Sequence, residues 1–386
     1  MALARAAGTA DIGYVDAGCP ARSQRGCAAA HTDAWRGGRQ RLGGHKPHPR
    51  NPAVPETTPP RYDVIAIGNA VVDVIASCPE ELIDELQLNR GGMTLIDEAR
   101  AEELYEAMPP ARELSGGSAA NTLAGLATLG LQCAFIGQVA EDQLGKVFRH
   151  DMRATGIDFD TPAREGEPAT GRVLIFVTPD GERTMNTFLG AGQFLPAAAL
   201  DEDLIASGAI LYLEGYLWDP EEPRRAMRRA IEVARNAGRK IAFTASESFV
   251  IERHGDDFRA MIEDGVIDIL FVNETELATL TGEDDFEAGL AAVADKVPVL
   301  VATRSEKGAV AIAHGERAEV AAVPVLKVVD TTGAGDQFAA GFLSGYVKGE
   351  PLTRCLKRGA ICASEVISHY GPRPEADMLK LMDERL

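Results

Sequence analysis

The chain has 386 residues, of which 45% are hydrophobic and 25% charged, and its formal net charge at pH 7 is −19. These values fit one large α/β domain with an accessory part and a sizeable core. Residues 1–60 contain eight Lys and Arg against four Asp and Glu, so the acidic excess lies in the remaining chain. An acidic body argues against nucleic acid or an anionic membrane as a partner.

Residues 1–60 show no hydrophobic period and are rich in Ala, Gly, Arg, Pro and His. We interpret them as a disordered N-terminal extension, or as the result of a reading frame opened upstream of the real start. A targeting peptide is the alternative, but Asp11, Asp16 and Asp33 and the lack of an apolar segment argue against it. The six cysteines lie far apart and several fall in apolar runs, which indicates buried thiols in a reducing compartment, the cytoplasm. The sequence has no apolar run of 18 residues, so we expect no membrane span.

In chain order, the hydrophobic pattern from residue 61 predicts alternating strands and helices. The first part contains strands at 62–68, 71–77, 93–96 and 132–138, and helices at 97–108, after the glycine turn 115–122, and at 143–155. Two strands at 173–178 and 184–189 then form a hairpin around Pro179-Asp180-Gly181-Glu182. The last part contains strands at 209–213, 240–245, 268–272 and 298–303, helices at 222–237, 256–264 and 274–295, a hairpin at 308–322, an apolar extended segment at 320–329, and helices at 335–348, 352–368 and 374–384.

This alternation predicts an α/β fold with a Rossmann-like, mostly parallel sheet covered by helices on both faces. Ligands would bind at the carboxyl ends of its strands. The segments at about 69–96 and 157–190 break the rhythm. We expect them to form a small antiparallel β lid, inserted into a domain that spans 61–386.

The stretch Asp330-Thr331-Thr332-Gly333-Ala334-Gly335-Asp336 leads into a predicted helix. Its glycines let a ligand approach the main chain, and the first amides of the helix can receive an anion. A carboxylate at position 336 would repel that anion, so it makes sense as a base that takes a proton from a hydroxyl attacking phosphorus. The alternative is an ordinary helix start capped by the aspartate. No Gly-x-x-x-x-Gly-Lys-Ser/Thr motif is present, so helix amides and Mg²⁺ would have to neutralise a polyphosphate.

Two motifs resemble the N-terminal and C-terminal signatures of the ribokinase-like (PfkB) family of carbohydrate and nucleoside kinases. They are Gly116-Gly117-Ser118-Ala119-Ala120-Asn121 and the stretch 330–336. Two weaker matches, Asn273-Glu274-Thr275-Glu276 and Thr303-Arg304-Ser305-Glu306-Lys307-Gly308, lie between them in the expected order. The resemblance covers the chain from about residue 61 to its end. It implies a phosphotransferase that uses ATP with Mg²⁺ and, as in many members, a monovalent cation such as K⁺.

The resemblance also assigns roles to single residues, as follows. Asp336 would be the catalytic base, and the amides of Gly333, Ala334 and Gly335 would form the anion hole. The acceptor would be bound by Asp73, Asn69, Gly116, Gly117 and Asn121, and ATP by Asn273, Glu276, Thr303 and Gly308. Glu276 would hold Mg²⁺ through water, and Asp330 and Thr332 would contribute to the monovalent-cation site.

Most of these roles have a structural alternative. Asp73 could be a surface strand residue, Gly116-Gly117 a simple turn, and Thr303 an ordinary strand residue. Glu276 could belong to a solvated helix face or be a first-turn charge that complements the helix dipole. Asn121 is a poor helix former at a helical position, which favours a functional role.

The acceptor is predicted from two features that resemble the adenosine kinase branch of the family. The spacing from Asp73 to Asn121 is long and includes a whole helix, and the run 301–308 is also similar. We therefore expect a purine nucleoside, adenosine first, to be phosphorylated on its 5′-hydroxyl. Met93, Phe176 and Phe188 are candidates to line the purine pocket, although such residues in strands are more often core.

Two other functions stay open. One is a sugar kinase of the ribokinase or fructokinase type. The other is a non-catalytic nucleoside-binding sensor, which the presence of Asp336 disfavours. The pattern does not choose between a monomer and a homodimer.

Overall fold

The computed structural model describes residues 59–386, which fall within one compact unit, Thr57–Leu386. The extension predicted for residues 1–60 therefore lies, up to residue 58, outside the described residues and stays a prediction.

A large sheet forms the centre of the domain. Its strands are β1 (Tyr62–Ile67), β5 (Cys133–Ile136), β6 (Ile157–Asp158), β9 (Gly208–Glu214), β10 (Lys240–Thr244), β11 (Ile269–Asn273), β12 (Val299–Thr303), β13 (Ala309–Ala313) and β14 (Glu316–Val320). The order is β14-β13-β12-β11-β10-β9-β1-β5-β6. All neighbours are parallel except β12–β13 and β13–β14, so the parallel strands end at one edge.

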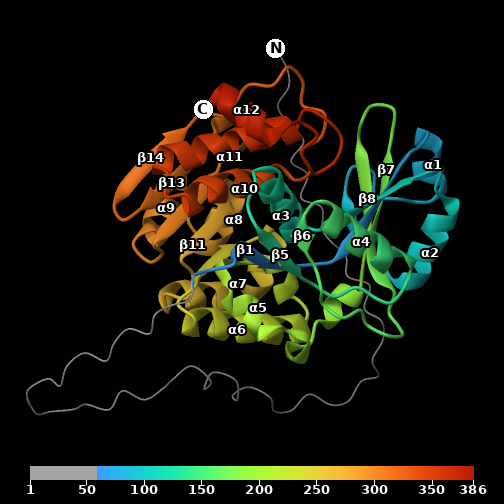
Figure 1. The fold of residues 1–386 in the computed structure, drawn as a ribbon. Coiled ribbons are helices and arrows are strands. Elements are labelled where there is room, and N and C mark those ends of the chain that lie inside the picture. Colours follow the sequence, from blue (N-terminus) through green and yellow to red (C-terminus); the bar gives the residue numbers. More distant parts are fainter. Residues whose placement is uncertain (1–58) are drawn as a thin grey trace, which may run out of the picture. The chain divides into compact units, whose positions relative to one another are not determined.

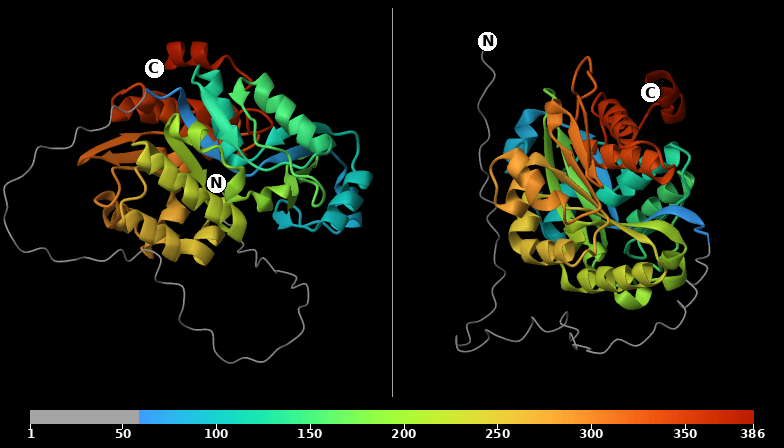
Figure 2. Two further views of the ribbon diagram at one scale, coloured as in Figure 1. Left: turned by 60° about the horizontal axis from the view of Figure 1, so that its bottom comes forward. Right: turned by 90° about the vertical axis from the view of Figure 1, so that its left-hand side faces the viewer.

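Helices cover both faces of this sheet (Figures 1 and 2). One face carries α3 (Ser118–Thr128), α4 (Gln143–Ala154), α10 (Ala334–Val347), α11 (Leu352–Val366) and α12 (Met378–Arg385). The other carries α5 (Glu202–Ala206), α6 (Glu221–Asn236), α7 (Ser248–Glu263), α8 (Glu274–Thr281) and α9 (Phe286–Ala294). Side chains of β1 alternate between the two cores, Val64 and Ala66 in one and Ile65 and Ile67 in the other. The predicted fold class is confirmed.

A second, small sheet lies beside the large one (Figure 1). It contains β2 (Val71–Ser77), β3 (Met93–Leu95), β4 (Arg112–Gly116), β7 (Thr170–Val177) and β8 (Arg183–Gly190) in the order β3-β8-β7-β2-β4. Helices α1 (Glu80–Glu85) and α2 (Glu98–Ala107) belong to its connections. The sheet is mixed rather than purely antiparallel, because β2 pairs with β7, and β3 with β8, in parallel.

Several elements differ from the sequence prediction. The helix expected at 274–295 is two helices, because Gly282 adopts a left-handed conformation and ends α8. Helix α7 begins at Ser248, eight residues before the predicted start. The segment 321–329 forms no strand, and Leu326 and Val328 are exposed there. The pattern did not predict α1, α5, β4 or β6, which are short or lack a clear period.

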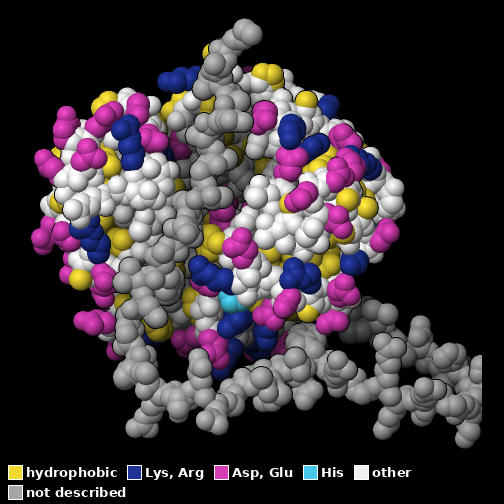
Figure 3. All heavy atoms as spheres, turned by 180° about the vertical axis from the view of Figure 1, so that it is seen from behind, with side chains coloured by type: hydrophobic (Ala, Val, Ile, Leu, Met, Phe, Trp, Pro, Cys, Tyr) yellow, Lys and Arg dark blue, Asp and Glu magenta, His cyan; other side chains and the backbone are white. Residues whose placement is uncertain are grey.

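No helix among residues 59–386 is long and apolar enough to cross a membrane. Over the face shown in Figure 3, acidic and basic side chains lie interspersed. The four cysteines within the described range, Cys78, Cys133, Cys355 and Cys362, are buried free thiols, as predicted, while Cys19 and Cys27 lie outside that range.

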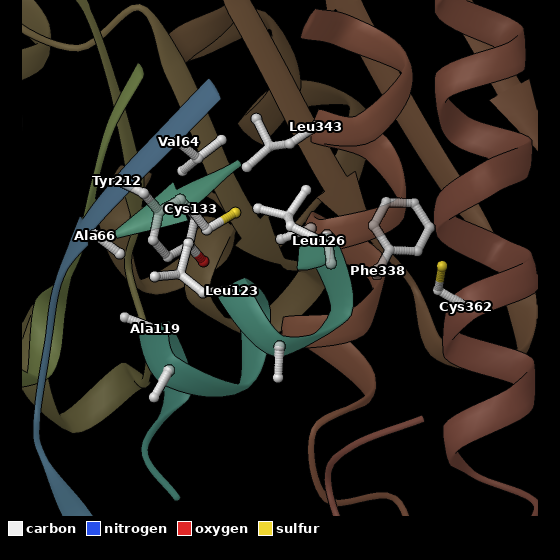
Figure 4. Packing of buried hydrophobic residues seen from close by; sticks show 14 of the residues in the cluster. Val64, Ala66, Ala119, Leu123, Leu126, Cys133, Tyr212, Phe338, Leu343 and Cys362 are labelled. Carbon is white, nitrogen blue, oxygen red and sulfur yellow. The ribbon is translucent and has the colours of Figure 1, made fainter. Parts of the chain in front are cut away.

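Helix α3 packs directly against α10. Leu123 and Leu126 of α3 point into the same apolar layer as Phe338 of α10 (Figure 4). Gly125 permits this approach, since a Cβ there would lie 2.8 Å from the Cβ of Ala340. The packing brings the first turns of the two helices together, although their sequences lie more than 200 residues apart.

Candidate active site

Asp336 lies in the first turn of α10, opposite the first turn of α3. Its Oδ1 accepts a hydrogen bond of 2.6 Å from the Ser118 hydroxyl, and its Oδ2 accepts one of 3.4 Å from the Asn121 side-chain amide. The two predicted signatures therefore meet at one carboxylate. Ser118 lies inside the N-terminal signature, but its role was not predicted.

The environment of Asp336 is suited to accepting a proton. Burial raises the pKa of its carboxyl from 3.8 to about 6, and the hydrogen bonds from Ser118 and Asn121 limit that rise. A general base works best when its pKa lies near the working pH. Asp336 combines that pKa with a fixed orientation.

The loop before α10 exposes main-chain amides. Gly333 has a φ of +76° and lies so close to Pro372 that a Cβ would sit 2.7 Å from its Cα, so only glycine fits. A Cβ on Gly335 would meet nothing within 4 Å. The Ala334 amide donates to the Thr331 carbonyl at 3.2 Å. Within residues 59–386 the amides of Gly333, Gly335 and Asp336 have no acceptor, so the donors open to an anion differ from the predicted trio by one residue.

Asp73 lies on β2 and is only 6% exposed as a residue, and it accepts no hydrogen bond from the described part of the chain. Gly116 on the neighbouring strand makes room for it, because a Cβ there would lie 2.5 Å from Oδ1. Burial raises the pKa of Asp73 to about 6, while Arg373 and then Arg183 lower it and Asp336 raises it. Asp73 is therefore a buried acceptor close to Asp336, with its hydrogen-bonding capacity unused.

Asn69 follows β1 and Gly117 precedes α3, and the two residues lie against each other. Gly117 has a φ of +98°, and a Cβ on it would lie 2.2 Å from the Asn69 carbonyl oxygen. Glu214, at the end of β9, accepts hydrogen bonds from the Asn69 amide at 2.7 Å and the Ala119 amide at 2.8 Å. Burial raises the pKa of this fully buried Glu214 to about 7. No pattern in the sequence pointed to Glu214, which is fully buried and positions both segments.

Arg373 enters the site from the C-terminal loop, and the sequence pattern did not single it out. Its Nε donates to the Asn121 side-chain oxygen at 3.2 Å, which orients the amide group toward Asp336. Burial lowers the pKa of Arg373, and the charges of Asp73 and Asp151 oppose that effect. Arg373 is thus a half-buried positive charge that contacts Asn121 of α3 and lowers the pKa of Asp73.

The predicted ATP residues form a separate group at the ends of β11 and β12. Asn273 is paired with Thr303 across these strands. Asn273 and Glu276 cap α8 reciprocally, with Asn273 Oδ1 accepting from the Glu276 amide at 2.8 Å and Glu276 Oε2 accepting from the Asn273 amide at 3.0 Å. Gly308 has a φ of +90°, and a Cβ on it would clash with the Val320 carbonyl. Asn273, Glu276 and Gly308 therefore each have a structural role, whereas these contacts give Thr303 none.

Glu276 has no free carboxylate oxygen to offer Mg²⁺ directly, so its predicted role would need a bridging water. Both its oxygens already accept hydrogen bonds from Asn273, the second from the side-chain amide at 2.6 Å. Burial raises its pKa to about 7. No group of three or more His, Cys, Asp or Glu in the described range could hold a metal ion. Mg²⁺ would therefore be carried mainly by the nucleotide phosphates, as is common for this ion.

Asp330 and Thr332 do not fit the predicted monovalent-cation site. The Arg183 guanidinium from β8 donates to Asp330 Oδ2 and, at 2.9 Å, to Thr332 Oγ1. The Asp330 and Arg183 side chains are 3% and 7% exposed. A positive charge supplied by the protein therefore already lies against both predicted ligands.

Residues 93–377 match the pfkB family of carbohydrate kinases. The chain is similar to the solved adenosine kinase from Sinorhizobium meliloti, with 44% identity, a TM-score of 0.78 and coverage of 84% of this chain and 99% of that one. It is equally similar to a probable sugar kinase from Rhizobium etli, with 43% identity, a TM-score of 0.79 and coverage of 84% and 98%. A fructokinase from Klebsiella pneumoniae is 29% identical over 234 residues, which are 60% of this chain and 76% of the relative. These matches make the chain a phosphotransferase that acts on an alcohol group, and it belongs to the pfkB family of carbohydrate kinases.

Proposed function

We propose that this kinase transfers the γ-phosphoryl group of ATP to the 5′-hydroxyl of a purine nucleoside, adenosine first. The observation that carries the proposal is the surroundings of Asp73, a single buried carboxylate on a largely apolar sheet face. The 44% identity to an adenosine kinase supports the same acceptor.

Strand pairing defines this face, which we call the site face of the small sheet. One row of paired residues across the strands consists of Asp73, Val173, Thr187 and Leu95. The next row consists of Ile75, Ile175, Met185 and Met93. Since paired residues point to the same side of a sheet, these eight side chains share one face. Most of them are only half-buried, and an apolar ring system such as a purine would cover them.

The predicted purine-pocket residues divide between the two faces. Met93 lies on the site face. Phe176 and Phe188 alternate with it and belong to the core on the opposite side, where Phe176 is fully buried. The expectation for these two phenylalanines is wrong, because strand periodicity fixes the side on which each residue lies but the sequence does not show which side faces the ligand.

The residues of the site support a direct in-line transfer. Asp73 would accept hydrogen bonds from the sugar hydroxyls and so orient the acceptor. Asp336, held by Ser118 and Asn121, would take the proton from the attacking hydroxyl. The open amides of Gly333, Gly335 and Asp336 would stabilise the charge on the transferred group, and Mg²⁺ accompanying ATP would neutralise its phosphates. The small sheet would act as a lid that excludes water from the reaction.

A sugar kinase is the second candidate, because the chain is almost as similar to a probable sugar kinase, at 43% identity, as to an adenosine kinase. A small sugar would need several polar partners, and the site face offers only Asp73 and Thr187 among its eight residues, with the exposed Arg112 of β4 paired beside Ile75. A non-catalytic sensor would not need a base, and Asp336 is present. A cytoplasmic location and a monomeric or dimeric state stay predictions.

The deciding experiment compares kcat/KM for adenosine, inosine, guanosine, ribose and fructose in the presence of ATP and Mg²⁺. We expect adenosine to give the highest value and AMP as its product. Asp336→Asn is the matched control, because it keeps the size of the side chain but removes the base; it should lower kcat by about 10²- to 10⁴-fold while nucleoside binding persists. A preference for ribose or fructose would identify the protein as a sugar kinase instead of a nucleoside kinase. If no acceptor led to the formation of ADP, the non-catalytic sensor would be the remaining function.

A further inference from the structure

Arg183 occupies the position at which the family resemblance placed a monovalent cation. It is the first residue of β8 and reaches from the small sheet to the loop before α10. Its guanidinium donates to the Asp330 carboxylate and to the Thr332 hydroxyl at 2.9 Å. This ion pair is almost completely buried.

The remaining capacity of Asp330 is also in use. Its Oδ1 accepts the Thr332 amide at 3.0 Å, and its Oδ2 accepts the Gly371 amide at 2.9 Å in addition to the guanidinium. One carboxylate therefore holds the loop, the C-terminal segment and the small sheet together. A cation added beside the guanidinium would bring two positive charges to the same buried carboxylate, which Coulomb repulsion opposes.

We propose that the Arg183 guanidinium replaces the monovalent cation in this chain, so that the kinase does not depend on K⁺. The guanidinium neutralises Asp330 and holds the loop whose amides face the phosphoryl group. A bound cation would perform the same two tasks. Because Arg183 belongs to the small sheet, this neutralisation also couples the position of that sheet to the loop. The inference rests on the proposed function only for the measurements of kinase rate; the Tm and rubidium measurements do not depend on it.

The test measures kinase rate and Tm in KCl, NaCl and choline chloride at equal ionic strength. For the wild type we expect the same rate and the same Tm in all three salts. Arg183→Gln removes the charge, so it should have a lower Tm and rate in choline and recover in KCl. With a Kd of about 10 mM, about 100 mM K⁺ would shift its equilibrium by roughly tenfold through mass action.

Arg90→Ala is the matched control. Arg90 also binds the β7–β8 hairpin, through Asp180 at 2.7 Å and Glu182 at 2.5 Å, but from the exposed side and without contact to Asp330. This variant should show no difference between K⁺ and choline. A K⁺ response equal to that of Arg183→Gln would mean that any loosening of the hairpin causes it, and it would overturn the proposal.

The wild-type measurements stand even if Arg183→Gln does not fold. A crystal soaked in RbCl should show no anomalous peak beside Asp330, and K⁺ should not raise Tm above its value in choline. A rubidium peak there, or a wild-type rate that needs K⁺, would refute the replacement. Should the wild type form no ADP with any acceptor, the proposed function fails, while the Tm and rubidium measurements still decide the cation question.

Discussion

The pH dependence of catalysis offers the sharpest test of the site, because two of its carboxyls have the same unusual pKa. Burial raises the pKa of both Asp73 and Asp336 to about 6. In the proposed reaction both must be ionised, Asp336 to accept a proton and Asp73 to accept hydrogen bonds from hydroxyls. A raised acid pKa means that the active, ionised form is present above pH 6 and is lost as the pH falls through that value.

The expected loss follows from these values. At pH 7 each group is about 90% ionised, and at pH 5 about 9%, if both have a pKa of 6. If both are required, kcat/KM falls by about 100-fold between pH 7 and pH 5; if only Asp336 is required, it falls by about 10-fold. The two charges repel each other, which separates the two protonation steps but leaves a limiting slope of two on the acid side of a logarithmic plot.

The assay is kcat/KM for the preferred acceptor from pH 4.5 to 8.5, with recovery at pH 7.5 after each acid exposure as the control for unfolding. Asp73→Asn should reduce the limiting slope from two to one, because only Asp336 then titrates. A wild-type profile that is flat down to pH 5 would show that neither carboxyl is needed in its ionised form. A slope of one in both proteins would remove Asp73 from the mechanism.

Three further substitutions test single parts of the site. Gly333→Ala should lower both Tm and kcat, because its Cβ would clash with Pro372 and its φ is left-handed, whereas a normal Tm would mean that the loop adapts. Gly335→Ala has free space for its Cβ, so circular dichroism and Tm should stay normal while KM for ATP rises if phosphate lies there; an unchanged KM would remove Gly335 from the anion site. Glu276→Gln keeps the side-chain oxygen that can cap Asn273, so Tm should fall by little; KM for MgATP should rise if Glu276 binds Mg²⁺ through water, and an unchanged KM would leave it as a helix cap only.

The sequence predicted the parts of the site that lie in continuous motifs. Gly117 and Gly333 directly precede α3 and α10, and hydrophobic periodicity located both helices. Direct packing of α3 against α10 brings these helix starts together, which is why Ser118 and Asp336, 218 residues apart, lie within hydrogen-bonding distance.

The same reasoning could not find residues whose role depends on long-range packing. Arg183 follows a hairpin turn, and Arg373 lies in a loop without a period, so neither position differs locally from an ordinary surface arginine. Glu214 ends a strand and gives no sign of the two amides that it binds. Phe176 was a candidate for the purine pocket but lies in the core. The sequence shows that it is an apolar strand residue, but not on which face of the sheet its side chain lies.

The charges of the site show why these arginines matter. The charges of Asp336 and Asp330 raise the pKa of the buried Asp73, and an acidic domain provides no general excess of positive charge to offset them. Arg183 neutralises Asp330 through a direct ion pair, and Arg373 stabilises the ionised form of Asp73. Among residues 59–386, Asp336 has only the neutral donors Ser118 and Asn121. Asp336 is therefore the one of these three carboxylates without a paired positive charge. Gaining a proton removes the unfavourable free energy of a buried negative charge.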